Sequence, residues 1–491
     1  MAHLFCEWLR VGYAVVSQNA QPPTGGHLGR SYYERRSPSG IEPLTRVRLG
    51  GDFSALPQGV RCWPDTDADR AIDPIQERIG DRLSPVARAT NFDLMETELP
   101  RCAEMGASCL EGVDAFLGLE SEWRDLARRA RTGNPFLSWE WVSEWARMFW
   151  DDQLVTVVVD LDSTPVAIAP FCPGPSVPAP GVRSKNLQLL GPRWGWNLSE
   201  MGSVLIDPAH ASEALAATVE HLWQRARWDW IEVMAFGDDI DAWQQALRRV
   251  TVNVDTSVES VSEIPVMRLD KSWEALRSRL RRNVKESIRR SYNAPRRDGV
   301  EYSYREHRTV VGLDAALDDF FRLHRARSEA SGGPSHADHF FRPSAQLFLR
   351  RVSRRMAEAG LLSISVCKAR GASVAVQINF EVDGWLYLYY SGFDPRWARY
   401  SVMTYTRTRS LRSAIDRHLE SVNFSPGVDQ AKKRWDVTMI PMQRFSIVLD
   451  RRQSRARFAL YSLLRKASVW LRAVRLRNIH RDQPPAAELS L

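Results

Sequence analysis

The stretch LLSISVCKARGASVAVQINFEVDGWLYLYYSG, residues 361–392, decides the fold of the second half of this chain. Apolar residues alternate with polar ones in three runs, which is the pattern of half-buried β-strands. The runs are 361–369, 373–382 and 385–392. Arg370-Gly371 separates the first two runs and Asp383-Gly384 the last two, and Asp-Gly is a dipeptide expected in a tight hairpin turn. We therefore predict an antiparallel meander of three strands.

The segments around the meander show the same order of helices and strands in both halves of the chain. In the first half we predict helices at 116–130, 136–150, 211–226 and 238–250, and strands at 154–160, 164–171 and 230–236. In the second half we predict further strands at 264–269, 300–306, 421–425 and 443–450, and helices at 277–297, 311–329, 343–359 and 401–418. This order predicts an α+β fold of tandem units, each a mainly antiparallel sheet flanked by helices. The second unit has the clearer pattern.

Composition and charge divide the 491 residues into four parts. Residues 1–100 contain nine Gly and nine Pro without a sustained period, so they cannot bury enough apolar area to offset chain entropy. We predict a disordered extension over 1–105, followed by the two units at 106–260 and 261–450. The tail, 451–491, has ten of the 67 Lys and Arg but only two of the 59 Asp and Glu, so it accounts for the whole net charge of +8.

The basic tail also contains apolar residues, which lie among the cations between Phe458 and Leu476. Helical periodicity gathers much of the apolar set on one side. We therefore predict a basic amphipathic helix over 451–481 that lies on an anionic membrane surface. A helix docked on the body of the protein and a basic tail that touches RNA are the alternatives.

Several classes of protein are excluded by what the sequence lacks. Six Cys without a C-x-x-C pair argue against a disulfide framework or a zinc ribbon and fit a reducing compartment. No uncharged apolar stretch of about 18 residues occurs, and the N-terminus does not have the pattern of a secretory signal. Walker, G-x-G-x-x-G, G-x-S-x-G and H-E-x-x-H motifs are absent from the sequence. We expect a cytoplasmic protein, with a peripheral position at the inner membrane through the tail.

The second and third strands of the meander bring polar side chains together. The polar face of strand 373–382 consists of Gln377, Asn379 and Glu381. In the next strand Tyr389 follows the same alternation as Tyr387, and Tyr390 is expected on the opposite face with two leucines. We interpret the amide-lined face beside several Tyr as a substrate surface. An ordinary solvated sheet face is the alternative.

The third strand of the meander continues through FDPRWARYSV into the helix at 401–418. Such a junction offers free backbone N–H groups and the positive end of a helix dipole, which suits a phosphate or pyrophosphate. Arg396 and Arg399 add positive charge there. Because every helix start has similar groups, the junction by itself does not identify the ligand.

Four sequence segments carry a resemblance to a known family: FFRLH (320–324), VAVQINFE (374–381), YLYYSGFDPRWARYS (387–401) and SPGVDQAKKRW (425–435). In this order they resemble the CelD-like acetyltransferase family of the GNAT superfamily, which is related to the Fem-type peptidoglycan aminoacyltransferases. In the first half, FLSWEWVSEW (136–145) and the following hairpin match the same pattern. The resemblance covers about residues 110–450 as tandem GNAT-like units, the first of them degenerate.

The resemblance implies a site for acetyl-CoA or another acyl-CoA as co-substrate, with the CoA pyrophosphate at 396–403. The implied cofactor-binding residues are Arg396, Arg399, Tyr400, Ser401 and Val402. The substrate candidates are Gln377, Asn379, Asp429, Lys432 and Trp435. The catalytic candidates are Glu381 and Asp394 as bases, with Tyr389, Tyr390 and His324. The chain departs from the family pattern in Asn423 and Ala431, and where Val402 and Met403 replace a Pro-Gly pair. Without this Gly the backbone loses its easiest close approach to a phosphate.

Two further features have competing interpretations. His324 lies on the inner stripe of its helix, so it is either a core histidine with satisfied hydrogen bonds or a residue of the cleft. The segment HADH (336–339) fits a loop that covers the cleft better than it fits a metal site. We expect no metal. The helix at 277–297 has nine Lys and Arg against Glu286, which suits an RNA backbone, an anionic substrate, a membrane surface or a plain solvated face. We expect no sequence-specific nucleic-acid binding, because no base-reading module accompanies this helix.

Together these observations predict an acyl-CoA-dependent N- or O-acyltransferase, with acetyl as the expected acyl group. The acceptor is expected to be a small molecule or a glycan or lipid precursor of the envelope or of an exopolysaccharide. Transfer would be direct: a backbone N–H near Tyr389 polarises the thioester, a carboxylate or water removes the acceptor's proton, and a Tyr or solvent protonates the thiolate. A Fem-like aminoacyl-tRNA-dependent transferase and a non-catalytic scaffold of a polysaccharide biosynthesis complex are the alternatives.

Overall fold

The computed structural model describes residues 105–149, 153–175, 183–191, 198–225, 228–330, 337–427 and 429–481. Side chains of the last helix are described as far as Ser468. The predicted disordered extension lies outside the described residues, except for Met105 at the start of the first strand. No helix among the described residues is long and apolar enough to cross a membrane.

The first repeat, Met105–Arg268, follows the order strand, two helices, three strands, helix, strand, helix, strand. Its elements are β1 (Met105–Glu111), α3 (Glu120–Ala130), α4 (Trp139–Phe149), β2 (Val155–Leu161), β3 (Thr164–Pro173), β4 (Asn186–Leu189), α5 (Ala211–Arg225), β6 (Trp230–Phe236), α6 (Asp238–Arg249) and β7 (Val254–Arg268). Short additions are α2 (Val113–Leu117), η1 (Pro135–Leu137), β5 (Leu205–Ile206) and η2 (Pro208–His210). The predicted boundary at 260/261 falls inside β7.

The second repeat, Tyr302–Leu449, has the same order. Its elements are β8 (Tyr302–His307), α9 (Leu313–Ser328), α10 (Pro343–Glu358), β9 (Leu362–Ala369), β10 (Ala372–Val382), β11 (Trp385–Phe393), η3 (Pro395–Tyr400), α11 (Val402–Asp416), β12 (Ser421–Asn423), α12 (Gln430–Lys433) and β13 (Thr438–Leu449). Helices α7 (Trp273–Arg279) and α8 (Arg282–Arg297) connect the repeats, and α13 (Arg452–Arg481) follows. The predicted α+β fold of tandem units is confirmed.

The described strands form one 13-stranded sheet in the order β1-β2-β3-β4-β6-β13-β7-β12-β11-β10-β9-β8, with β5 paired to β3. Its pairs are antiparallel except β4 with β6 and β11 with β12. These two parallel pairs occupy equivalent places in the two repeats, and each is connected by a crossover through a helix, α5 or α11, as parallel strands require.

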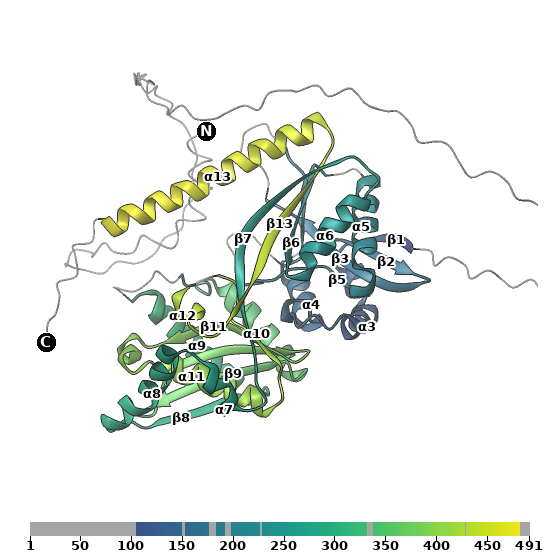
Figure 1. Ribbon diagram of the computed structural model, residues 1–491. Helices are drawn as coiled ribbons and strands as arrows, with labels where there is room; N and C mark the ends of the chain where they lie inside the picture. The colour runs from purple at the N-terminus through teal and green to yellow at the C-terminus, as the bar shows by residue number, and fades with distance from the viewer. Residues whose placement is uncertain are drawn as a thin grey trace, which may run out of the picture. The chain divides into compact units, whose positions relative to one another are not determined.

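The last strands of the two repeats are exchanged. Strand β13 of the second repeat pairs with β6 of the first, and β7 of the first repeat pairs with β12 of the second. The two exchanged strands also pair with each other over most of their length, and Figure 1 shows them side by side between the repeats. Because each repeat completes the sheet of the other, the two repeats form one hydrogen-bonded unit.

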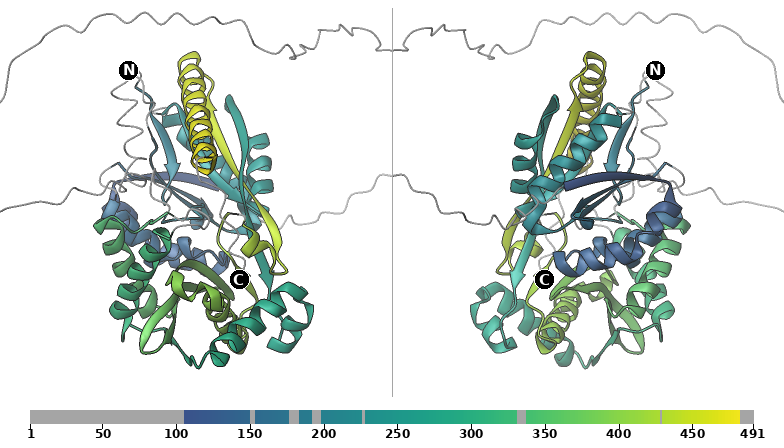
Figure 2. Two further views of the ribbon diagram at one scale, coloured as in Figure 1. Left: turned by 90° about the vertical axis from the view of Figure 1, so that its left-hand side faces the viewer. Right: turned by 90° about the vertical axis from the view of Figure 1, so that its right-hand side faces the viewer.

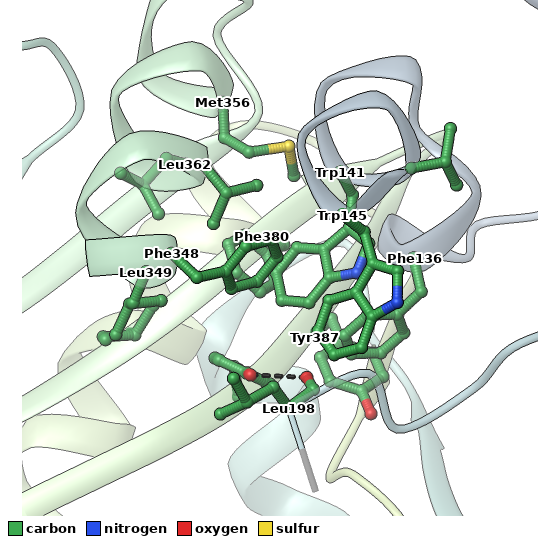
Figure 3. Close-up of a cluster of buried hydrophobic side chains, with 14 of the residues drawn as sticks. Phe136, Trp141, Trp145, Leu198, Phe348, Leu349, Met356, Leu362, Phe380 and Tyr387 are labelled. Carbon is green, nitrogen blue, oxygen red and sulfur yellow. Dashed lines mark hydrogen bonds between the residues drawn. The ribbon is translucent and has the colours of Figure 1, made fainter. Parts of the chain in front are cut away.

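A shared aromatic core joins the repeats on one face of the sheet (Figure 3). Phe136 and Trp141 of the first repeat meet Tyr387, Phe348 and Phe380 of the second edge to face, with ring centroids 5.1–5.6 Å apart. Such pairs each contribute about 0.5–1.5 kcal/mol beyond the area they bury. The Trp-rich helix of the first repeat is therefore a packing helix for the second.

The hairpin predicted at Asp383-Gly384 is confirmed, since both residues have positive φ, 48° and 83°, as a type I′ turn requires. The alternation predicted beyond it is wrong at Tyr390. The two-residue step Gln377–Asn379 of β10 lies opposite the three-residue step Leu388–Ser391 of β11, so β11 contains one extra residue. This β-bulge places Tyr390 beside Tyr389 in the aromatic core, with ring centroids 4.5 Å apart.

The first half of α13 docks on the body, the position that the sequence left open as an alternative to the membrane. The Tyr461 ring packs 5.1 Å from Trp230, and the Ser454 hydroxyl and Arg457 guanidinium donate hydrogen bonds to the buried Asp229 carboxylate at 2.8 and 2.9 Å. Arg465 donates to the Glu232 carboxylate of β6. Both views of Figure 2 show α13 alongside β13.

Candidate functional site

The strands β11 and β12 separate in the middle of the sheet of the second repeat. They pair in parallel over only three residues each, the last pair being Tyr387 and Asn423. Beyond that pair β11 continues to Phe393 whereas β12 ends, so no described strand pairs with this side of β11. The β-bulge lies directly after the point of separation, and the Tyr390 carbonyl accepts from the Gln377 amide at 3.2 Å. Backbone groups of β11 are thus available to a ligand in this opening.

Four cations surround the opening: Arg327, Arg407, Lys432 and Arg434. We call these four side chains the cation cluster. The Arg407 guanidinium lies over the Phe424 ring, 5.6 Å from its centroid, and Arg434 donates to the Thr404 hydroxyl in the first turn of α11 at 3.2 Å. Arg327, near the end of α9, donates to the Ser391 hydroxyl on β11 at 3.1 Å. The cluster therefore lies between the open end of β11, the start of α11 and the segment that contains α12.

The cation cluster is short of negative charge. Burial lowers the pKa of Arg407 to about 10, and repulsion from Arg434 adds to this while Asp429 opposes it. Burial also lowers the pKa of Arg327 and of Arg434, and Asp429 again supplies the compensating attraction. The Nε atoms of Arg407 and Arg434 are buried without a hydrogen-bond acceptor. Buried cations normally have acceptors, so the arrangement suits an anionic ligand.

The predicted substrate residues of the segment 425–435 organise the floor of the opening. The Lys432 ammonium donates to the carbonyl groups of Ser425, Pro426 and Gly427 at 3.0–3.1 Å, and so holds that loop closed from inside. Asp429 caps the N-terminus of α12 by accepting from the Lys432 amide at 2.6 Å. The Trp435 side chain is fully buried beneath Arg407. The structure thus places the candidates Asp429 and Trp435 beside the cation cluster, to which the third candidate, Lys432, belongs.

The polar face of β10 is covered by α11 and is neither a solvated nor an open cleft face. Gln377 and Asn379 are at most 1% exposed, and the Asn379 amide donates to the Ser365 hydroxyl at 3.3 Å. Glu381 is 8% exposed and accepts from Arg308 at 2.5 and 2.7 Å and from Arg417 at 2.5 Å. The expectation of an exposed amide-lined surface is therefore wrong, because a helix rich in Thr and Ser packs on it.

His324 lies in the core, on the face opposite α11. It is fully buried, its Nδ1 is 3.1 Å from the Ser391 carbonyl, and the Phe340 and Tyr390 rings meet it edge to face. Burial lowers the pKa of His324 to about 4, so the ring is neutral near pH 7. Of the HADH segment, His336 lies outside the described residues. Within the described ranges, no three His, Cys, Asp or Glu side chains are grouped to hold a metal ion.

The junction before α11 forms the 3₁₀ turn η3. Asp394 caps it by accepting from the Arg396 amide at 3.0 Å and pairs with the Arg396 guanidinium, whose side chain is 87% exposed. Arg399 donates to the Tyr400 hydroxyl, which in turn donates to Asp298 at 2.8 Å. Ser401 has φ 54°, a left-handed conformation that glycine adopts most easily. It precedes Val402 and Met403, whose N–H groups come before the first helical hydrogen bond of α11.

Glu200, Arg407 and Arg434 are functional candidates that the sequence did not single out. Glu200 lies in the loop after β4 of the first repeat, and its carboxylate accepts from the Tyr387 hydroxyl at 2.7 Å. Burial raises its pKa to about 7, although Tyr387 and Lys432 act in the opposite direction. No periodic pattern marks Glu200. A sequence signal does exist for Arg407, because a cation among the threonines of TYTRTRS has no acid nearby to pair with.

Comparison with known domain families agrees with this geometry. Residues 278–433 match the model of the acetyltransferase (GNAT) domain. This part of the chain is a GNAT domain. It contains the meander, the opening between β11 and β12 and every predicted site residue except Trp435. Three of the four members of the cation cluster, all but Arg434, also lie in it. The chain is accordingly a transferase of the acyl-transfer class, as predicted.

Several solved structures resemble the chain at low identity. FemX is 10% identical with a TM-score of 0.48 over 70% of this chain and 97% of its own. L-PGS from Bacillus licheniformis is 9% identical with a TM-score of 0.43 over 70% and 96%. A tandem GNAT protein from the clavulanic acid biosynthesis pathway is 10% identical with a TM-score of 0.38 over 70% and 98%. Likenesses this distant carry no argument beyond the GNAT match. No curated protein sequence matches the chain significantly.

Proposed function

We propose that this chain is an acyl-CoA-dependent N- or O-acyltransferase of the CelD-like kind, with acetyl-CoA as donor. The acceptor is an envelope or exopolysaccharide precursor. The observation that carries the proposal is the opening between β11 and β12, with its β-bulge and the anion-deficient cation cluster around it. An acyl-CoA contributes phosphates for the cations and a thioester for the opening.

The residues around the opening fit the two ends of such a donor. Arg407 and Arg434 have buried Nε donors without acceptors, which a phosphate oxygen satisfies. The N–H groups of Val402 and Met403 at the start of α11 add an anion site at a helix N-terminus. Arg396 and Arg399 belong to η3, directly before this helix start, where they add positive charge. Ser401 in place of glycine limits how closely the backbone can approach a phosphate.

The chemistry is direct transfer from the thioester to an amine or hydroxyl. A backbone N–H of the bulged strand near Tyr389 stabilises the negative charge that develops on the carbonyl oxygen. Lys432 keeps the 425–427 loop in place beside the reacting groups. Glu381 and Asp394, the sequence candidates for the base, are both held by arginine side chains, which favours structural roles for them.

An aminoacyl-tRNA-dependent reaction is the second candidate. It is favoured by an open groove of about 540 Å³ beside the start of α8, whose lining combines three cations with polar groups. The lining residues are Arg281, Asn283, Gln430, Ala431, Lys433 and Arg434. Arg434 also belongs to the cation cluster, so an RNA 3′ end in this groove would reach the same opening.

Calorimetry with acetyl-CoA separates these candidates. We expect acetyl-CoA to bind to the full chain in the micromolar range, and free aminoacyl-tRNA to compete weakly. The double variant Arg396→Ala with Arg399→Ala should weaken CoA binding more than it lowers the melting temperature. Binding of aminoacyl-tRNA without acetyl-CoA would support the second candidate. If the chain bound neither acetyl-CoA nor aminoacyl-tRNA, the non-catalytic scaffold would be the remaining alternative.

We further propose that the end of the tail contacts an anionic membrane surface, which places the protein peripherally at the inner membrane. The support is the sequence of α13 after Ser468, where Arg472, Arg475, Arg477 and Arg481 follow without an acid. Cations near an anionic surface contribute roughly 1 kcal/mol each. The docked first half of α13 fixes the start of this segment on the body.

A further inference from the structure

A loop of the first repeat reaches the opening of the second. After β4 the described chain resumes at Leu198, and successive residues are each fixed by a contact. The Leu198 carbonyl accepts from the Tyr389 hydroxyl at 2.5 Å, which Figure 3 shows as a dashed line beside Leu198. The Ser199 hydroxyl accepts from the Trp141 indole at 3.1 Å. The Met201 carbonyl accepts from the Asn134 amide at 2.8 Å.

Glu200 is thereby held at the point where the two strands separate. Its partner Tyr387 belongs to the last residue pair of β11 and β12, opposite Asn423. The Asn423 amide contacts the Met201 sulfur at 3.5 Å, so the neighbour of Glu200 lies against β12 as well. A carboxylate whose neighbours on both sides are fixed is positioned for chemistry.

Glu200 and Arg407 approach the opening from opposite faces of the sheet. Tyr387 and Tyr389 belong to the aromatic core on the face of α4 and α10, whereas Leu386 and Leu388 pack with α11 on the other face. Arg407 lies on the α11 side, against Phe424 and Trp435. A donor whose phosphates bind Arg407 and Arg434 on the α11 side therefore leaves the Glu200 side for the acceptor.

The charge environment of Glu200 supports a role in proton transfer. The titratable groups that face it are Tyr387 and Tyr389 of β11 and Lys432 of the α12 segment. Burial raises the pKa of Glu200 to about 7, and both Tyr hydroxyls have pKa values raised well above 10 by burial, so they stay protonated. A general base is most effective when its pKa lies near the working pH.

On these grounds we propose that Glu200, supplied by the first repeat, is the general base that removes the proton of the acceptor in the second repeat. The acceptor nitrogen or oxygen forms a bond to the acyl carbon while its proton moves to the Glu200 carboxylate. The C–S bond breaks, and the CoA thiolate takes a proton from solvent, to which Glu200 later releases its own. This inference rests on the proposed acyltransferase function.

The test uses the full-length chain, acetyl-CoA as donor and water as acceptor, with thiol release as the signal. For the wild type we expect kcat/KM to rise with pH through an apparent pKa near 7. Glu200→Gln should lower kcat at least 100-fold and abolish this pH dependence, while acetyl-CoA affinity by calorimetry stays within threefold. Tyr387→Phe, which removes a hydrogen bond to the carboxylate, should move the profile to higher pH.

Asp239→Asn is the matched control. Asp239 is also a carboxyl group of the first repeat whose pKa burial raises, to about 6, and it accepts from Ser203 of the same loop. We expect this variant to keep the rate and the pH profile of the wild type. An unchanged profile in folded Glu200→Gln would overturn the assignment of Glu200 alone. A wild type that neither binds acetyl-CoA nor releases thiol would overturn the proposed function, and the role of Glu200 with it.

Discussion

The side chains of Glu200 and Tyr387 meet at 2.7 Å, although 187 residues separate them and they belong to different repeats. The strand exchange explains how this contact is held in place. Because β13 completes the sheet of the first repeat and β7 that of the second, neither repeat can move without breaking a β-ladder. The opening in the second repeat is therefore a site built by both.

Glu200→Gln should change the pH dependence of stability. The pKa of this carboxyl is raised from 4.5 in the unfolded chain to about 7 in the folded protein. Between these two pH values the folded state binds more protons than the unfolded state, so the free energy of unfolding decreases as the pH rises through this range. The variant should therefore unfold at a higher temperature than the wild type at pH 8, by the equivalent of roughly 1–3 kcal/mol, and match it near pH 4.5. Thermal melts at both pH values check this. An equal melting temperature at pH 8 would contradict the raised pKa.

Arg407→Met should separate binding from stability. A buried cation whose pKa is lowered from 12.5 to about 10 destabilises the folded state at neutral pH, so its removal should leave the melting temperature unchanged or raise it. Acetyl-CoA affinity, measured by calorimetry, should fall at least tenfold. Arg409→Met is the control, since Arg409 lies over the Tyr304 ring and is not in the cation cluster. Equal losses in both variants would argue against an anion site.

Gly392→Ala should destabilise the second repeat. A Cβ at this position would lie 2.4 Å from the His324 backbone nitrogen and 2.7 Å from the Leu323 carbonyl carbon, so α9 would have to move off β11. Overpacking of this kind costs about 1–3 kcal/mol. Gly106→Ala is the control, because nothing lies within 4 Å of its added Cβ. Chemical denaturation should show a lower midpoint for the first variant only.

Glu381→Gln should lower stability and leave the pH profile of activity in place. The change removes the carboxylate that Arg308 and Arg417 share in a largely buried site, which should cost about 2 kcal/mol. Glu286→Gln, in an exposed pair with Arg289, should cost less than about 0.5 kcal/mol. Urea melts of both variants give the comparison. If Glu381→Gln abolished the pH dependence of activity, Glu381 and not Glu200 would be the general base.

Two truncations separate the halves of α13. A chain that ends at Ser468 keeps the contacts to Asp229 and Glu232, so we expect the melting temperature of the full chain but loss of flotation with anionic vesicles. A chain that ends at Asp450 should also melt several degrees lower, because Asp229 loses Ser454 and Arg457. Neutral vesicles and added salt are the controls. Flotation by both truncated chains would show that the tail is not the anchor.

The sequence alone determined the architecture of the repeats. Period-two alternation over 361–392, with glycine at both turns, can be satisfied only by a meander with one apolar face, because the side-chain period of a strand is two. The order of the remaining helices and strands then limits the fold to tandem α+β units. The segments around 320–324, 387–401 and 425–435 were enough to indicate the GNAT domain, which the match over 278–433 supports.

Only the tertiary structure decided which groups meet. Alternation could not show the extra residue that turns Tyr390 into the aromatic core, nor that α11 would cover the polar face of β10. It also could not show that Glu200 lies beside Tyr387. Periodicity reports whether a face is buried, whereas the partner on that face depends on strand exchange and crossovers that join residues far apart in the chain. Those partners determine whether a charged group is paired or lacks a counter-ion. The cation cluster and Glu200 could therefore be recognised only in the folded chain.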